Sequence, residues 1–226
     1  MARVLIGIVG YYQFIRAYPL GPELMARLQA GSWPDGVSIQ EMNWGPIAIV
    51  QDFQASAEKF DRVVLVGAVD RGLSLGTLSC RRWAGGTLDA LAVQRRVFEA
   101  VTGVISLDNL LIIGTHFGVW PETVITVEVQ LSESSLSDLV LSEIEVDRVS
   151  GQRAVIGESP LTPDNDRIVD GIVEFCRRAA LNSADDLQEF GSLTSDQVTP
   201  VATVCHNEFM DESSYPGKLN FGEKAR

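Results

Sequence analysis

Histidine is scarce in this chain, and its scarcity limits the chemistry that the protein can carry out. Only two histidines occur in 226 residues, His116 and His206, which leaves no set for a histidine-rich catalytic or metal site. His116 lies in GTHFGVWPE, after a short predicted helix, and is typical of a hydrogen-bonded loop residue. His206 adjoins Cys205 without the second Cys or His pair that a zinc site needs.

Cysteines are few as well, and they are widely spaced. Cys80, Cys176 and Cys205 contain no CxxC pair, so the sequence predicts neither a disulfide framework nor a zinc ribbon, and a reducing cytoplasm fits best. The apolar run near the N-terminus is short and lacks a cleavage site for export. No apolar stretch approaches the length of a membrane span, so we expect an unexported, cytoplasmic protein.

Nucleotide-binding and hydrolase motifs are also missing, as is a surplus of positive charge. The chain has no P-loop, no GxGxxG turn after its first predicted strand and no GxSxG elbow. It has 30 acidic against 18 basic residues, a net charge of -12 and a pI of about 4.6. This charge argues against non-specific binding to nucleic acid or to an anionic membrane, because phosphate would be repelled. A protein partner remains compatible with this charge.

Apolar runs alternate with helical patterns in the first half of the chain. Unbroken apolar runs are typical of parallel strands that are covered on both faces, and alternation with helices indicates repeated βαβ units. The predicted elements here are a strand at Arg3–Val9, a helix at about Leu20–Ala30, a strand at Val37–Met42, a helix at about Pro46–Glu58 and a strand at Arg62–Gly67. The sequence thus predicts an α/β fold of three layers, with helices on both faces of a mostly parallel, twisted, five-stranded sheet.

The second half supplies the remaining elements. An edge strand is predicted at 77–83, a helix between Leu88 and Val101, a short helix at Ser106–Ile113 and a strand from Thr123. Apolar and polar residues alternate from Leu139 to Ile156 around Ser150 and Gly151, which predicts an added β-hairpin, although Leu141 and Ile144 also have helical spacing. The sequence LTPDNDRIVDGIVEFCRRAA predicts a helix capped by Thr162.

The end of the chain has a different composition. Beyond residue 181 the apolar pattern weakens, and acidic residues, TP and SYPG follow. We therefore expect two parts, an α/β domain at 1–181 and an acidic, flexible or surface-draped C-terminal tail at 182–226.

Four motifs occur in order along this domain: RVLIGIVGYYQFIRAYPLGPEL from Arg3, GAVDRGLSLGT at 67–77, GVWPETVITVEVQ from Gly118 and LTP at Leu161. They resemble motifs of the hydrogenase maturation endopeptidases, which remove a C-terminal tail from the large subunit of nickel–iron hydrogenases. GAVDRGLSLGT is similar to the family pattern DAVDxGxxPGT. RVLIGIVGYYQFIRAYPLGPEL, from Arg3, resembles the first strand and loop, with glycines at Gly10 and Gly21. GVWPETVITVEVQ, from Gly118, and LTP, at Leu161, follow in the family's order. The resemblance covers residues 3–181, with an enlarged stretch near 132–158.

The resemblance implies a nickel site, and the sequence departs from the family at each ligand. The family's first-loop acidic residue falls near Ala17, its strand-end aspartate falls on Gly67 and its histidine falls near Gly103. None of these residues offers a metal ligand through its side chain, so we expect no cofactor and no catalytic residue. Asp70, Asp108 and Glu23 could in principle form a relocated site, but separate carboxylates at helix starts and turns are more often caps and solvated charges.

The first loop, YYQFIRAYP, concentrates large apolar side chains where the family's site is framed. These rings either fill the space of a lost metal site or form a docking surface, since tyrosine combines apolar area with a polar tip. Trp44 is expected beside the same crevice. The candidate partner-binding crevice consists of Tyr11, Tyr12, Phe14, Arg16, Tyr18, Trp44 and Asp70.

Three functions are compatible with these patterns. The leading hypothesis is a catalytically degenerate member of the family that binds a hydrogenase or other metalloenzyme subunit as an assembly factor. An active endopeptidase that processes the large subunit is the second. The third is an unrelated small-molecule or regulatory α/β domain, because this architecture serves many functions.

Overall fold

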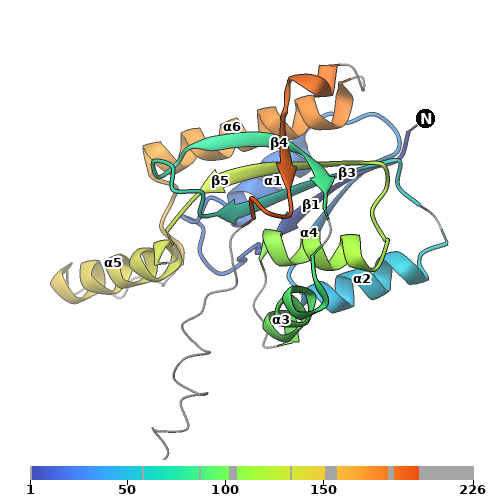
Figure 1. Cartoon of the computed structure of the whole chain (residues 1–226). Coiled ribbons are helices and arrows are strands. Elements are labelled where there is room, and N and C mark those ends of the chain that lie inside the picture. Colours follow the sequence, from blue (N-terminus) through green and yellow to red (C-terminus); the bar gives the residue numbers. More distant parts are fainter. Residues whose placement is uncertain are drawn as a thin grey trace, which may run out of the picture.

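In the described part of the chain, six strands form one sheet in the order β2-β1-β3-β5-β4-β6 (Figure 1). The computed structural model describes residues 2–57, 59–86, 88–101, 106–132, 134–150, 157–182 and 186–198. The strands are β1 (Val4–Val9), β2 (Val37–Met42), β3 (Arg62–Val69), β4 (Leu78–Gly85), β5 (Thr123–Gln130) and β6 (Gly191–Thr194). β2, β1, β3 and β5 are parallel, whereas β4 runs antiparallel to β5 and β6 pairs with β4 in parallel.

Helices cover both faces of this sheet, so the predicted three-layer α/β fold is confirmed. The helices are α1 (Pro22–Ala30), α2 (Pro46–Ala55), α3 (Ala90–Val101), α4 (Leu107–His116), α5 (Ser135–Ser150) and α6 (Pro163–Leu181). α1 and α6 lie on one face, and α2 and α4, with α3 outside them, lie on the other (Figure 1). None of the helices in the described part of the chain has the length and apolar composition needed to span a bilayer.

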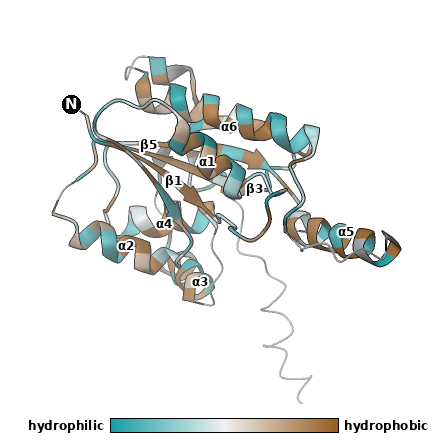
Figure 2. Cartoon of the chain, turned by 180° about the vertical axis from the view of Figure 1, so that it is seen from behind, coloured by the Kyte–Doolittle hydropathy of each residue, from teal (hydrophilic) through white to brown (hydrophobic). Residues whose placement is uncertain are grey.

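Burial explains why the central strands are apolar on both sides. In β1 every residue is buried, and hydrophobic residues dominate the strands seen in Figure 2. Ile6, Val64 and Val127 pack under α1 and α6, while Leu5 and Leu65 pack under α2 and α4. Apolar runs without alternation therefore predicted these strands correctly, because both faces of a parallel sheet are covered.

The helix predicted after LTP is also confirmed. It begins at Pro163, and the Oγ1 of Thr162 accepts a hydrogen bond from the backbone N–H of Asn165 at 3.2 Å. Proline is favoured at the first helical position because its missing N–H would have no partner there. His116, predicted in a loop, is instead the last residue of α4.

The predicted β-hairpin at Leu139–Ile156 is wrong, because residues 135–150 form the helix α5. Alternation of apolar and polar residues was misleading in this stretch. Leu136, Leu139 and Val140 have the spacing of residues on one face of a helix, and they pack against the cluster under α1 and α6. Residues 151–156, the second half of the predicted hairpin, lie outside the described residues.

The described part of the predicted tail, residues 186–198, lies at the edge of the sheet. Residues 186–189 form a 3-10 turn, and β6 adds a sixth strand at the edge of β4, where five had been expected. Leu187, Phe190, Leu193 and Val198 are buried. A short strand that covers an open edge satisfies backbone hydrogen bonds that β4 would otherwise present to solvent. Residues 199–226, which include Cys205 and His206, lie outside the described residues.

Candidate functional site

The carboxyl end of β3 leaves no room for a side chain at Gly67. A Cβ atom at this position would lie 2.9 Å from the Cβ of Leu107, the first residue of α4. Contacts this short are essentially never made by real Cβ atoms. Gly67 therefore allows α4 to pack closely on the sheet, and Leu107 fills the space into which a strand-end aspartate would project.

Glu128 is the residue of β5 that lies beside Gly67 in the sheet. Its side chain is fully buried, a state that is strongly unfavourable for a carboxylate unless it is paired and hydrogen-bonded. The hydroxyl groups of Thr126 and Ser79 donate to it at 3.2 and 3.3 Å. Arg71 donates to it through Nη2 at 3.1 Å.

Arg71 joins Glu128 to the beginning of α4. Its Nη1 and Nη2 atoms donate to the two carboxylate oxygens of Asp108 at 2.8 and 2.6 Å, and its side chain is buried. Burial alone would lower the pKa of the Arg71 guanidinium, but hydrogen bonds and charge from Asp108 and Glu128 raise that pKa above its ordinary value. We call Arg71, Asp108 and Glu128 the Arg71 cluster.

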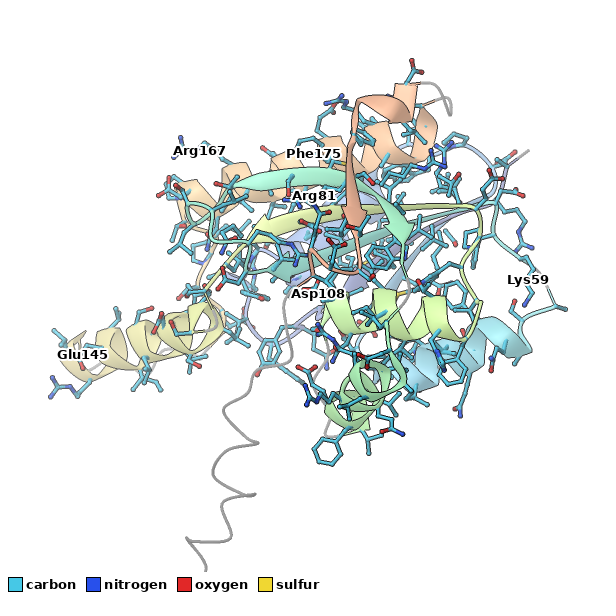
Figure 3. All side chains as sticks on the ribbon, in the orientation of Figure 1. Lys59, Arg81, Asp108, Glu145, Arg167 and Phe175 are labelled. Carbon is cyan, nitrogen blue, oxygen red and sulfur yellow. The ribbon has the colours of Figure 1, made fainter. Side chains whose placement is uncertain are left out.

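The Nε atom of Arg81 lies 3.6 Å from Glu128, so the cluster and this neighbour contain two guanidinium groups and two carboxylates. Figure 3 shows Asp108 at the start of α4 and Arg81 on β4, two segments that the cluster connects through β5. A buried group of charges with this balance needs no external cation, because each carboxylate already faces an arginine.

Gln130 holds the turn that carries Asp70 and Arg71. Its Oε1 accepts from the backbone N–H of Arg71 at 2.7 Å, and its Nε2 donates to Asp70 Oδ1 at 2.9 Å. The backbone N–H of Gly72 donates to the same oxygen at 3.0 Å. These bonds, first that from Gly72 and then that from Gln130, lower the pKa of Asp70. Asp70, which was predicted in the crevice, is therefore exposed, and its carboxylate stabilises the turn after β3.

Arg71 and Glu128 were not predicted from the sequence, although β5 contained a signal for them. Thr126, Glu128 and Gln130 occupy every second position of β5 and alternate with the apolar residues Val127 and Val129. Side chains at this spacing share one face, and both faces of a central parallel strand are buried. Three polar residues on a covered face should have predicted a buried polar network.

The first loop divides between the core and the surface. Ala17 and Tyr18 are buried, and burial raises the pKa of Tyr18. Tyr18, which was predicted in the partner-binding crevice, therefore lies in the core and has little exposed surface. Tyr11 and Tyr12 are half-buried, and Phe14, which is 65 % exposed, makes an edge-on ring contact with Tyr12.

Arg16 and Trp44 are exposed at the same end of the sheet. Arg16, in the first loop, forms an ion pair with Glu23 at the start of α1. Trp44 follows β2 and is also exposed. Phe14 and Trp44 are thus the large apolar side chains, among the predicted crevice residues, that reach the surface at the carboxyl edge of the sheet.

The described residues do not fit the nickel site that the family resemblance implies. Ala17 is buried without a donor side chain, Gly67 is covered by Leu107, and Gly103 lies outside the described residues. The three carboxylates considered for a relocated site each have a separate partner: Asp70 has Gln130, Asp108 has Arg71 and Glu23 has Arg16. Within the described ranges, no three His, Cys, Asp or Glu side chains are grouped to hold a metal ion.

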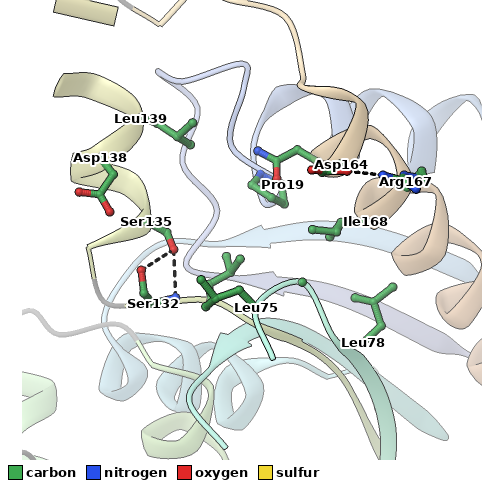
Figure 4. A pocket seen from close by; sticks show the side chains of 13 residues that line it. Pro19, Leu75, Leu78, Ser132, Ser135, Asp138, Leu139, Asp164, Arg167 and Ile168 are labelled. Atoms are coloured by element: carbon green, nitrogen blue, oxygen red, sulfur yellow. Dashed lines mark hydrogen bonds and ion pairs between the residues drawn. The ribbon is translucent and has the colours of Figure 1, made fainter. Parts of the chain in front are cut away.

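A cavity of about 710 Å³ opens at the same edge of the sheet, on the face of α1 and α6 (Figure 4). Its apolar wall includes Leu78, Leu131 and Ile168. Its polar rim includes Asp138 at the base of α5, and Asp164 and Arg167, which form an ion pair at the start of α6. This cavity was not predicted from the sequence, because α5, which forms part of its wall, was not predicted as a helix.

No protein-family model matches the sequence, and no curated protein matches it either. Among solved structures, an endopeptidase from Escherichia coli is 16% identical, with a TM-score of 0.47 over 78% of this chain and 91% of that one. A hydrogenase 2 maturation peptidase from a Thaumarchaeota archaeon is 16% identical, with a TM-score of 0.40 over 78% and 97%. A NiFe hydrogenase maturation protease from Thermococcus kodakarensis is 14% identical, with a TM-score of 0.39 over 80% and 94%. The function of this chain must therefore be argued from its own residues.

Proposed function

We propose that this chain is a hydrogenase maturation protease-like protein that binds a metalloenzyme subunit without cutting it, as a cytoplasmic assembly factor. The ordered motifs between residues 3 and 181 support the family assignment. The proposed loss of peptidase chemistry is supported most directly by the packing at Gly67, because Leu107 occupies the space of the strand-end ligand.

The electrostatics of the Arg71 cluster support the same conclusion. The guanidinium of Arg71 is already bonded to both carboxylates that lie near the family's ligand positions, Asp108 and Glu128. A divalent cation would be repelled by this permanent positive charge and would have to displace it from two buried partners. The subunit-binding role is supported by the exposed rings of Phe14 and Trp44 at the same edge, since aromatic residues are enriched in protein interfaces.

Nickel or cadmium titrated into the full chain is expected to give no stoichiometric heat of binding in calorimetry, because the crevice offers no free set of ligands. A variant in which His116 and His206 are both replaced by alanine is the control for adventitious imidazole binding. Stoichiometric binding that persists in this variant would contradict the proposal and would favour a relocated metal site.

A nickel–iron hydrogenase large-subunit precursor with its C-terminal tail is expected to co-elute with the chain while its mass stays unchanged. Replacing Phe14 and Trp44 with serine should weaken this complex roughly tenfold or more, because buried aromatic anchors dominate interface energy. Phe117→Ser is the matched control, since Phe117 is exposed at the far end of α4. Loss of the tail from metal-loaded precursor would instead establish an active endopeptidase, and absence of any complex would contradict the subunit-binding role.

A further inference from the structure

α5 projects from the body of the protein, and the other described residues leave most of its outer surface uncovered (Figure 1). With 16 residues it is about 24 Å long. Its beginning is anchored, because Leu136, Leu139 and Val140 pack against the core. Further along, Leu141 and Val149 are 62 % and 74 % exposed.

Apolar residues surround α5 rather than forming a single stripe. Ile144 and Val146 are exposed in addition to Leu141 and Val149, and Figure 2 shows hydrophobic and hydrophilic residues interspersed along the whole helix. A surface helix normally has an apolar stripe toward the core and a polar outer face, whereas a helix that is apolar all round is normally buried. The outer side of α5 therefore has the apolar composition of an interface that another molecule covers.

The cavity at the base of α5 extends this surface into the body of the protein. Ser135, Asp138 and Leu139 line the cavity and belong to the first turns of α5, and Leu75, whose side chain is exposed, lies on its wall (Figure 4). A concave apolar space beside an exposed apolar helix suits an anchoring side chain of the molecule that covers the helix.

The charge around this surface identifies the kind of partner. The described residues 134–150 and 157–170 together contain eight Asp or Glu residues, two Arg and no Lys. Arg27 neutralises Asp166 and Asp170 in part, but an acidic surplus remains. A second copy of this chain, or an anionic membrane, would bring like charges together. A basic polypeptide segment would bring opposite ones.

We propose that α5 and the cavity at its base form a docking site for a basic polypeptide segment of a partner protein. Apolar side chains of that segment cover Leu141 and Val149, and one of them enters the cavity, while its Lys or Arg side chains face Asp138 and Glu145. This site deepens the proposed function by naming the partner surface that it binds, and Glu145 marks its far end in Figure 3.

The test uses the full chain and two synthetic amphipathic peptides about as long as α5, one of leucine and lysine and one with glutamate at each lysine position. Fluorescence anisotropy should show binding of the lysine peptide and at least tenfold weaker binding of the glutamate peptide. Replacing Leu141 and Val149 with serine keeps the charge of α5 and should weaken binding of the lysine peptide roughly tenfold. The matched control replaces Phe98 and Val101 on α3, which are 65 % and 72 % exposed, and should leave binding unchanged.

Several results would overturn the inference. Equal binding of the two peptides would contradict the charge preference, and equal affinity of the α5 and α3 variants for the lysine peptide would contradict the role of α5. Binding to anionic vesicles that depends on Leu141 would identify a membrane as the occupant instead. A dimer that dissociates when Leu141 and Val149 are replaced would identify a second copy of the chain. If the hydrogenase precursor binds but the lysine peptide does not, only the α5 site is wrong. If the peptide binds through α5 but the precursor does not, the proposed function is wrong and the docking site stands.

Discussion

Replacing Arg71 with methionine is expected to lower the free energy of unfolding by about 3 to 5 kcal/mol, because the change leaves two buried carboxylates without their shared partner. Asp108 and Glu128 are both buried, so water cannot take the place of the guanidinium without opening the start of α4. Urea denaturation, followed by circular dichroism at neutral pH, measures the effect.

Two controls distinguish the effect of losing a buried ion pair from the effect of removing an arginine at any position. Arg148→Met removes an exposed ion pair with Glu145 and should leave the unfolding midpoint nearly unchanged, since exposed pairs contribute little. A variant that combines Arg71→Met with Asp108→Asn and Glu128→Gln removes the stranded charges as well, and it should recover part of the lost stability. An effect of Arg71→Met no larger than that of Arg148→Met would disprove the structural role of the cluster.

Gly67→Asp, which restores the acidic residue of the family pattern, is expected to destabilise the protein by about 3 to 5 kcal/mol or more. Its Cβ would clash with Leu107, which alone corresponds to an overpacking cost of about 1 to 3 kcal/mol. Its carboxylate would also be buried beside Glu128, which adds an unfavourable like charge. The same denaturation experiment measures the loss.

Alanine variants test the steric part of this prediction separately. Gly67→Ala should cost about 1 to 3 kcal/mol, whereas Gly191→Ala, where a Cβ would meet nothing within 4 Å, should change stability by less than about 0.5 kcal/mol. Combining Gly67→Ala with Leu107→Gly should cost less than the sum of the two single changes, because Leu107→Gly removes the Cβ atom that the new methyl group would meet. Strict additivity would show that Gly67 and Leu107 do not constrain one another.

Local patterns predicted most of the fold, and they failed where one pattern suits two structures. The strands β1, β3 and β5 were recognisable because apolar residues fill both of their faces. α5 was mistaken for a hairpin because alternation from Leu139 onward suits a strand as well as an irregularly apolar helix. β6 was missed because a four-residue strand has almost no pattern of its own and depends on the exposed edge of β4.

For the candidate site, the sequence predicted only the absence of the family's metal ligands. Gly67 replaces the first aspartate of the DAVDxGxxPGT pattern, and the close packing of Leu107 explains why no side chain fits at this position. The Arg71 cluster could not be found in the same way, because Arg71 meets residues that are 37 and 57 positions away in the sequence. The buried polar residues of β5 indicated that such partners exist, without identifying Arg71 among them.

The Arg71 cluster also determines how the carboxyl edge of the sheet can respond to a partner. The turn after β3, the first turn of α4 and the end of β5 are bound to one another through buried charges, so none of them can move away alone without leaving a charge unpaired. An edge held in this way is preorganised, and little conformational entropy is lost there when a partner docks. If the proposed partner docks at this edge, it meets a rigid template, and the partner rather than this protein has to adapt its shape.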